Sequence, residues 1–214
     1  MITRDRRSPR PFAHERPHLL LLAGVALVPF VMLAIWARFY SPAPWEPGVL
    51  HSLALGNDAW SNVMRMVNTL GNLPVWAVVV TSLAVLMAIV RGMAAGVLVA
   101  LSFVADLAAF AVKIVVERAR PETAATQHFF GPDNFSFPSG HVVRAVALAA
   151  VLGWLLAPIG WRRRTALVAA LGAWLVMGYA RVSLGVHWPT DTIGGALLGV
   201  AWFGLTTAVL AHSE

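Results

Sequence analysis

The sequence predicts an all-α fold, a six-transmembrane-helix bundle that forms a single domain over residues 18–214. Three observations support this prediction. The composition is 58% hydrophobic and only 12% charged, whereas soluble domains are roughly 45–50% apolar and about 25% charged. Six apolar stretches recur along the chain, each near the ~17–25 residues that a helix needs to cross a bilayer. No internal repeat and no linker separates them.

The first apolar stretch is too long for the core of a signal peptide, and no convincing small-residue cleavage site follows it, so a membrane anchor is expected. Residues 1–17 hold five arginines among prolines and are predicted to form a flexible basic tail that contacts anionic lipid. The six predicted helices cover residues 18–40, 73–90, 93–116, 141–157, 165–183 and 193–211.

Basic residues predict the orientation of the bundle. If the six helices alternate in direction, the N-terminal arginines, Arg91 and the run 162–164 lie on one side and hold the larger share of the 16 Lys and Arg residues. The positive-inside rule makes that side cytoplasmic, with both chain termini. The compact chain with few loops favours a bacterial inner membrane.

Residues 41–72 are too long for a simple turn and carry little charge. Leu53, Trp60, Val63 and Leu70 recur at roughly helical spacing, which predicts two short helices in the outer interface, with Gly56-Asn57 as the stop and cap between them. An ordinary packed loop is the alternative.

Composition excludes several kinds of site and partner. The chain has no cysteine, so a disulfide framework, a thiolate metal site and a cysteine nucleophile are excluded. The net charge of +6 reflects membrane orientation, and no aromatic-basic module that would bind nucleic acid is visible.

Polar residues gather in three stretches on the predicted outer side, the first over residues 113–121. Lys113 and Arg120 are seven residues apart, so both are expected on one side of the third helix. Pro121 disfavours helix at Arg120. Two cations that snorkel to the headgroups are the alternative.

The second polar stretch is Pro-Ser-Gly-His at 138–141. Ser139 is a favoured N-cap and Gly140 lets a ligand approach the backbone, so free N–H groups and the positive helix end predict an anion site. His141 stands in the first helical turn. A capped helix with a surface histidine is the alternative.

The third polar stretch, residues 181–191, places His187 four residues before Asp191. Asp191 falls in the first turn of the last helix, where it can accept a hydrogen bond from one ring nitrogen of His187 and leave the other as a nucleophile. Such an acid often only compensates the helix dipole. Arg181 adds a third cation.

Together these stretches predict an anion site on one membrane face. Lys113, Arg120 and Arg181 are positively charged, which disfavours the rival interpretation of two histidines and Asp191 as ligands of a divalent metal. Neither a metal nor another cofactor is therefore expected.

The order Lys-x6-Arg-Pro, Pro-Ser-Gly-His and Arg-x5-His-x3-Asp resembles the three-part signature of the type-2 phosphatidic acid phosphatase family, whose soluble relatives include vanadium haloperoxidases. The resemblance implies a haloperoxidase-like helical core and a role for each motif residue. One departure is Ala180, where the family usually has a serine. The implied phosphate ligands are Lys113, Arg120, Arg181 and the Ser139–Gly140 turn. The resemblance also implies that His187 is the nucleophile, that His141 is the acid that protonates the leaving oxygen, and that Asp191 orients His187.

These observations predict an integral membrane phosphatase that acts on a lipid phosphate or diphosphate through a phosphohistidine. Among the substrates that the resemblance allows, a polyprenyl diphosphate ranks first, and phosphatidate or phosphatidylglycerol phosphate next. A phosphotransferase would keep every motif residue. A lipid-binding or transport protein would be expected to lack His187 or Asp191. Besides the substrate and membrane lipids no partner is predicted, and the oligomeric state stays open.

Arg144 follows His141 by three residues, one turn deeper in the helix, and lies outside the family signature. An ionisable side chain at this depth usually has a pairing or functional reason. Either it pairs with an acid, Glu117 or Asp106, or it reaches a second phosphate of a diphosphate substrate.

Overall fold

The structure is a computed structural model that describes residues 15–122 and 131–213. Every regular element in this part of the chain is a helix. Most of the predicted basic tail lies outside the described residues, so its conformation stays a prediction. The α-helices are α1 (Arg16–Phe39), α2 (Glu46–Ser52), α3 (Ala59–Leu70), α4 (Leu73–Arg91), α5 (Met93–Val116), α6 (Gly140–Leu156), α7 (Arg162–Ser183) and α8 (Pro189–Ser213), and the short 3₁₀ helices are η2 (Gly131–Asn134) and η3 (Ile159–Trp161).

Five of these helical stretches are long and apolar enough to cross a membrane: α1, α4, α5, the stretch Ile159–Ser183 that includes α7, and α8 up to Leu210. The sixth predicted span, α6, is apolar but has only 17 residues. It is buried along most of its length, because α5, α7 and α8 pack around it. The all-helical membrane fold is therefore confirmed, whereas a sixth crossing stays a prediction.

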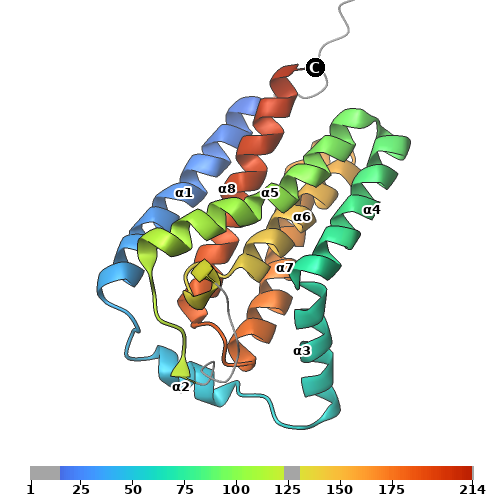
Figure 1. Cartoon of the computed structure of the whole chain (residues 1–214). Helices are drawn as coiled ribbons and strands as arrows, with labels where there is room; N and C mark the ends of the chain where they lie inside the picture. Colours follow the sequence, from blue (N-terminus) through green and yellow to red (C-terminus); the bar gives the residue numbers. More distant parts are fainter. Residues whose placement is uncertain (1–14, 123–130, 214) are drawn as a thin grey trace, which may run out of the picture.

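Successive long helices run in opposite directions, so alternate ends meet at the same end of the bundle. The C-terminal ends of α5 and α7 and the N-terminal ends of α6 and α8 converge at the lower end in Figure 1, near α2 and α3. Each of the three polar stretches follows or begins one of these helices. The bundle topology therefore places all three at one end of the molecule.

Close backbone contact joins α6 to α8 at two glycines spaced four residues apart. A Cβ added at Gly195 would lie 2.9 Å from the Ser139 carbonyl oxygen, and one at Gly199 would lie 2.8 Å from the Val143 carbonyl oxygen. Glycine at these positions lets the two backbones approach. As a result the Ser139 N–H donates to the Asp191 carbonyl oxygen at 3.1 Å, which links two of the motif stretches.

The segment 41–72 folds into the two short helices that its pattern predicts, but the predicted stop at Gly56 and the predicted cap are wrong. Helix α2 ends at Ser52, four residues before Gly56. Helix α3 is capped by Asp58, not Asn57: the Asp58 carboxylate accepts from the Ser61 N–H at 2.8 Å and from the Ser61 hydroxyl at 2.6 Å. A carboxylate suits the positive end of a helix better than a neutral amide does.

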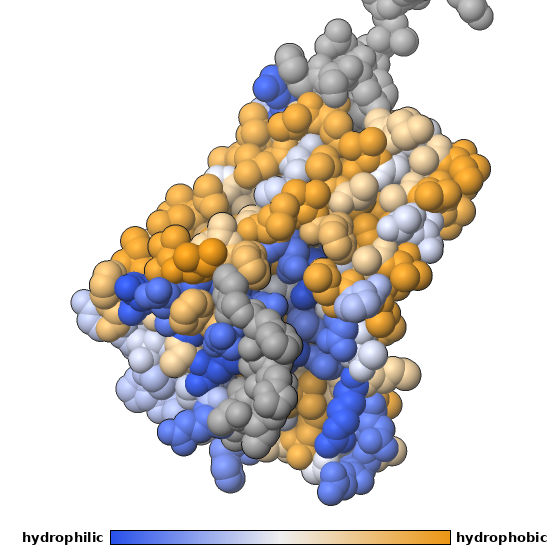
Figure 2. All heavy atoms as spheres, viewed as in Figure 1, coloured by the Kyte–Doolittle hydropathy of each residue, from blue (hydrophilic) through white to orange (hydrophobic). Residues whose placement is uncertain are grey.

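Hydrophobic side chains are exposed where a lipid environment would cover them. Figure 2 shows hydrophobic residues over the upper part of the bundle and hydrophilic residues gathered at the lower end, where the polar stretches meet. Exposed apolar residues also line α3, among them Trp60, Val63 and Met66. This exposure supports the predicted position of α3 in the interface.

Candidate active site

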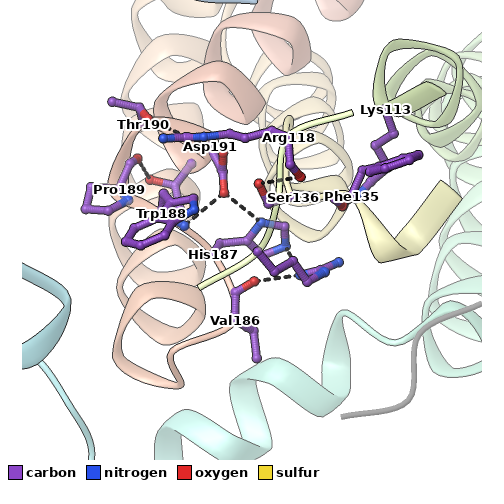
Figure 3. Close-up of polar contacts among 12 residues, drawn as sticks. Lys113, Arg118, Phe135, Ser136, Val186, His187, Trp188, Pro189, Thr190 and Asp191 are labelled. Atoms are coloured by element: carbon purple, nitrogen blue, oxygen red, sulfur yellow. Dashed lines mark hydrogen bonds and ion pairs between the residues drawn. The ribbon is translucent and has the colours of Figure 1, made fainter. Parts of the chain in front are cut away.

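His187 and Asp191 lie in contact at the start of α8. His187 Nδ1 is 3.3 Å from Asp191 Oδ2, and the same oxygen accepts from the Trp188 N–H at 2.8 Å. Figure 3 shows the Asp191 carboxylate directed at both groups. Both side chains are buried. An ionised carboxylate only accepts, so the proton of a neutral His187 lies on Nδ1 and its Nε2 carries a lone pair.

The lone pair of His187 faces a guanidinium. Its Nε2 lies 3.2 Å from Arg120 Nη1. Burial, together with the nearby charges of Arg120, Arg181 and Lys113, holds the pKa of His187 well below its ordinary value. A histidine in this setting is neutral at physiological pH and has the unprotonated nitrogen that a nucleophile needs.

The three predicted cations come together around His187 from three parts of the chain. Lys113 donates to the Phe135 carbonyl oxygen at 2.6 Å and lies 3.6 Å from Asp133 Oδ1. Arg120 donates to the Val186 carbonyl oxygen at 2.6 Å, and Arg181 donates to Asn68 Oδ1. Burial lowers the pKa of Arg120 to about 10, which leaves its guanidinium charged at neutral pH.

The prediction that Lys113 and Arg120 project from one helix is wrong. Helix α5 ends at Val116, and Glu117 adopts a left-handed conformation with φ 50°. The chain therefore leaves the helix three residues before Arg120. Beyond it, the Arg118 carbonyl oxygen accepts from the Ser136 N–H at 2.8 Å. This contact, and not helical periodicity, positions the segment from which Arg120 reaches His187.

Two of the motif residues each hold a buried polar atom that has no hydrogen-bond partner within the described part of the chain. These atoms are Ser139 Oγ and Arg181 Nε. The Ser139 N–H is already used by the Asp191 carbonyl oxygen, so this residue offers its hydroxyl rather than the free N–H that its sequence predicts. Buried polar atoms of this kind are normally satisfied by a ligand or water. Both are donors, as an anion requires.

His141 stands in the first turn of α6, as predicted, and contacts two residues outside the family signature. Its Nε2 lies 3.2 Å from Asn72 Oδ1, and its Nδ1 lies 3.4 Å from Arg144 Nη2. The amide oxygen only accepts, so Nε2 carries a proton. In this arrangement the Nε2 proton of His141 is donated to Asn72, and Nδ1 faces the Arg144 guanidinium.

Arg144 pairs with one of the two acids expected for it. Its Nη1 lies 3.7 Å from Asp106 Oδ2, and its Nε donates to the Gly140 carbonyl oxygen at 3.2 Å. Glu117 instead pairs with Arg38 at 2.6 Å, because the left-handed turn at Glu117 directs it toward α1. These contacts support pairing for Arg144, although its Nη1 is also a buried donor with no hydrogen-bond partner among the described residues.

Several residues at the site carry no sequence signal of their own. Asn68 and Asn72 resemble ordinary polar residues at the end of one helix and the cap of the next, and Glu46 is one of two acids in a weakly charged segment. Arg118 stands two residues before Arg120, but its spacing gives no hint of a role. Asn68, Asn72 and Arg118 are recognised only from their contacts with Arg181, His141 and Asp191. Glu46 is recognised only from its contact with Arg118.

The family model of the PAP2 superfamily matches residues 91–213, more than half of the chain. The chain belongs to the PAP2 superfamily. All three polar stretches lie within the matched range. The resemblance inferred from the three motifs is confirmed.

Curated PAP2 relatives match over parts of their length. Phosphatidylglycerophosphatase B of Bacillus subtilis (strain 168) is 34% identical over 94 residues, which cover 42% of this chain and 45% of that protein. Lipid A 1-phosphatase of Rhizobium johnstonii is 38% identical over 109 residues, 46% of this chain and 40% of that protein. Decaprenylphosphoryl-5-phosphoribose phosphatase of Mycobacterium tuberculosis (strain H37Rv) is 33% identical over 99 residues, 46% of this chain and 51% of that protein. The similarity thus spans about half, or less, of these relatives.

A solved structure supports the PAP2 fold over most of the chain. The crystal structure of a transmembrane PAP2 type phosphatidylglycerolphosphate phosphatase from Bacillus subtilis matches with a TM-score of 0.72 and 24% identity. The match covers 86% of this chain and 94% of that one. The helical arrangement described above is therefore that of a membrane PAP2 protein.

Proposed function

We propose that this protein is an integral membrane phosphatase that hydrolyses a lipid phosphate or diphosphate through a phosphohistidine intermediate. One observation carries the proposal: the unprotonated nitrogen of the buried His187 contacts Arg120 and lies near the charges of Arg181 and Lys113. The motif residues Ser139 and Arg181 also hold buried donors, Ser139 Oγ and Arg181 Nε, that no described residue satisfies. A nucleophile inside an anion site is the arrangement that phosphoryl transfer requires. The three relatives above are all named as phosphatases of lipid-linked phosphates.

In the first step, His187 Nε2 attacks phosphorus while the bond from phosphorus to the lipid oxygen breaks. Arg120, which contacts this nitrogen in the structure, turns to a phosphate oxygen. The three cations neutralise the phosphate oxygens in the transition state. Asp191 stabilises the positive charge that develops on His187, through the hydrogen bond at Nδ1.

His141 supplies the proton that the leaving oxygen needs. It acts as an acid once both ring nitrogens are protonated, and the negative charge of a bound phosphate favours that form. In the second step water attacks phosphorus, His141 takes its proton, and the bond between phosphorus and His187 breaks. Inorganic phosphate leaves, and His187 returns to its starting state. The positive charge of the site disfavours a divalent metal ion in either step.

The relatives change the expected order of substrates. Four of the curated relatives, from Bacillus subtilis, two strains of Escherichia coli and Shigella flexneri, are named phosphatidylglycerophosphatase B. We therefore place phosphatidylglycerol phosphate first and polyprenyl diphosphates second.

The proposed topology follows the distribution of basic residues. Both termini lie in the cytoplasm, and the site lies at the external face of a bacterial inner membrane. Helix α6 forms a sixth crossing within a single domain.

Phosphate release from a panel of lipid phosphates in detergent tests the proposal. The purified protein should release phosphate from at least one member, activity should survive a chelator, and His187→Ala should abolish it. Transfer to an added alcohol instead of water would identify a phosphotransferase. The absence of phosphate release from every member, or equal release by His187→Ala, would contradict the proposed function.

A further inference from the structure

A buried charge network lies directly behind the His187–Asp191 pair. The Arg118 guanidinium is 3% exposed and lies between two carboxylates that are fully buried, Glu46 and Asp191. Its Nη2 lies 2.6 Å from Glu46 Oε2, and its Nη1 lies 2.5 Å from Asp191 Oδ1. Its Nε donates to Ser41 Oγ. Glu46 begins α2, outside the residues that the PAP2 family model matches.

Glu46 accepts four hydrogen bonds on its two carboxylate oxygens. Oε1 accepts from the Thr190 N–H at 3.1 Å and from the Thr190 hydroxyl at 2.6 Å. Oε2 accepts from the Ala43 N–H at 2.8 Å and from Arg118 Nη2 at 2.6 Å. An ionised carboxylate can accept on all four of these contacts. Glu46 is thus the negative partner of Arg118, and Thr190, the residue next to Asp191, also holds it.

Arg118 determines how the Asp191 carboxylate is turned. By binding Oδ1, it leaves Oδ2 for His187 Nδ1 and the Trp188 N–H. Figure 3 shows Asp191 between Arg118 and His187. The guanidinium plane is packed between two indole rings, with Cζ 5.5 Å from the Trp36 ring centre and 5.8 Å from that of Trp188. An arginine fixed in this way has little freedom to release the carboxylate.

The charges of the network explain why a second carboxylate is present. Arg118 alone would neutralise Asp191, and a neutral pair would do little for the positive charge that His187 acquires when it attacks phosphorus. Glu46 makes the sum of the three charges −1. A net negative charge thus remains behind His187, on the side opposite the three phosphate-binding cations.

We infer that Glu46 is a positioning residue for the reaction at His187, acting through Arg118: it holds the Asp191 carboxylate in place and keeps the group behind His187 negatively charged. This role rests on the proposed function. It involves no contact with the phosphate, so it concerns the rate of attack and not the binding of the anion.

The test compares Glu46→Gln with Glu117→Gln in the full-length protein. Glu117 is a matched control because it also pairs with an arginine, Arg38, at 2.6 Å and at the same end of the bundle, but on the surface. For the lipid that wild type hydrolyses fastest, kcat of Glu46→Gln should fall about 10- to 100-fold, as for residues that orient a catalytic group, with KM nearly unchanged. Glu117→Gln should match wild type.

Two inhibitors separate positioning from damage to the site. Vanadate gains affinity by bonding to the nucleophilic nitrogen, whereas inorganic phosphate is held by the cations alone. Glu46→Gln should weaken inhibition by vanadate at least about tenfold while inhibition by phosphate changes less than about twofold. Glu46→Asp keeps the charge but withdraws the carboxylate, so it should weaken vanadate inhibition less than Glu46→Gln does, again with little change in phosphate inhibition. If Glu46→Gln does not fold, the same comparison is made with Glu46→Asp.

Three results would overturn the inference. One is a kcat for the Glu46 variants equal to that of Glu117→Gln, and another is a parallel loss of phosphate and vanadate inhibition, which would indicate a collapsed site. Both leave the proposed function standing. The third is a wild-type protein that hydrolyses no lipid phosphate, which would overturn the proposed function and this role together.

Discussion

At the scale of single residues, the chemistry depends on which ring nitrogen of His187 is free. The carboxylate of Asp191 holds the proton at Nδ1, so Nε2 is the nitrogen that we propose as the nucleophile. His187→Ala should abolish turnover, and Asp191→Asn should slow kcat by roughly 10²- to 10⁴-fold because the amide no longer enforces the tautomer. Steady-state kinetics, with melting temperature to show folding, measures both. Full activity in purified His187→Ala would contradict the assignment.

The environment of His187 also predicts the pH dependence. Burial and the charges of Arg120, Arg181 and Lys113 hold its pKa well below the ordinary value. His187 attacks only when it is neutral, so activity is lost as pH falls through this lowered pKa. The acid limb of kcat/KM, which reports the free enzyme, should therefore lie well below the ~6.5 of an ordinary histidine. A pH profile with an acid limb at or above pH ~6.5 would show that His187 is not the titrating nucleophile.

Arg144 is expected to act through its contacts with Asp106, Gly140 and His141. Arg144→Gln should reduce activity on monophosphate and diphosphate lipids alike and destabilise the fold by about 1–3 kcal/mol, because a buried pair is broken. Parallel assays on both lipid classes and a thermal melt measure this. A loss confined to the diphosphate lipid, at unchanged stability, would instead show that Arg144 binds a second phosphate.

At the scale of helices, the site depends on how closely α8 approaches α6. Gly195 and Gly199 lie where an added Cβ would meet backbone atoms of α6. This contact keeps Ser139 next to Asp191. The spacing of four residues places both glycines on one helical face.

Gly199→Ala should therefore destabilise the protein by about 1–3 kcal/mol, since neither backbone has room to move. Gly172→Ala on α7 is the control, because a Cβ there meets nothing within 4 Å; alanine at this position should leave stability unchanged or raise it by up to about 1 kcal/mol. Thermal melts in one detergent compare the two variants. Equal melting temperatures would show that the α6–α8 contact tolerates a methyl group.

At the scale of the whole molecule, alternation of helix direction separates two ends of different chemistry. The candidate active-site residues lie at the end of the bundle that holds α2 and α3. Arg91, at the C-terminal end of α4, and η3, just before α7, lie at the opposite end. The chain has no cysteine, so single cysteines report on each end. Asn57→Cys should react with an impermeant thiol reagent on whole cells, and Gly160→Cys only after lysis. The reverse pattern would invert the proposed topology.

The helices, the membrane class and the family could be predicted from the amino-acid sequence. Apolar runs of spanning length predict membrane helices because the bilayer leaves the backbone few other options. Helices α5 and α6 lie within one residue of their predicted bounds. The cap of α3 and the position of Arg120, which lies beyond the end of α5, differ from the prediction because local and tertiary contacts decide them.

Which polar groups contact one another could be seen only in the folded structure. Glu46 and Asp191 are linked through Arg118, and Asn72 contacts His141, although no spacing connects these residues in the sequence. Helices arise from hydrogen bonds between residues four apart, which sequence periodicity records. Ion pairs between distant segments depend on how the helices pack, and no spacing within the sequence records which side chains will meet.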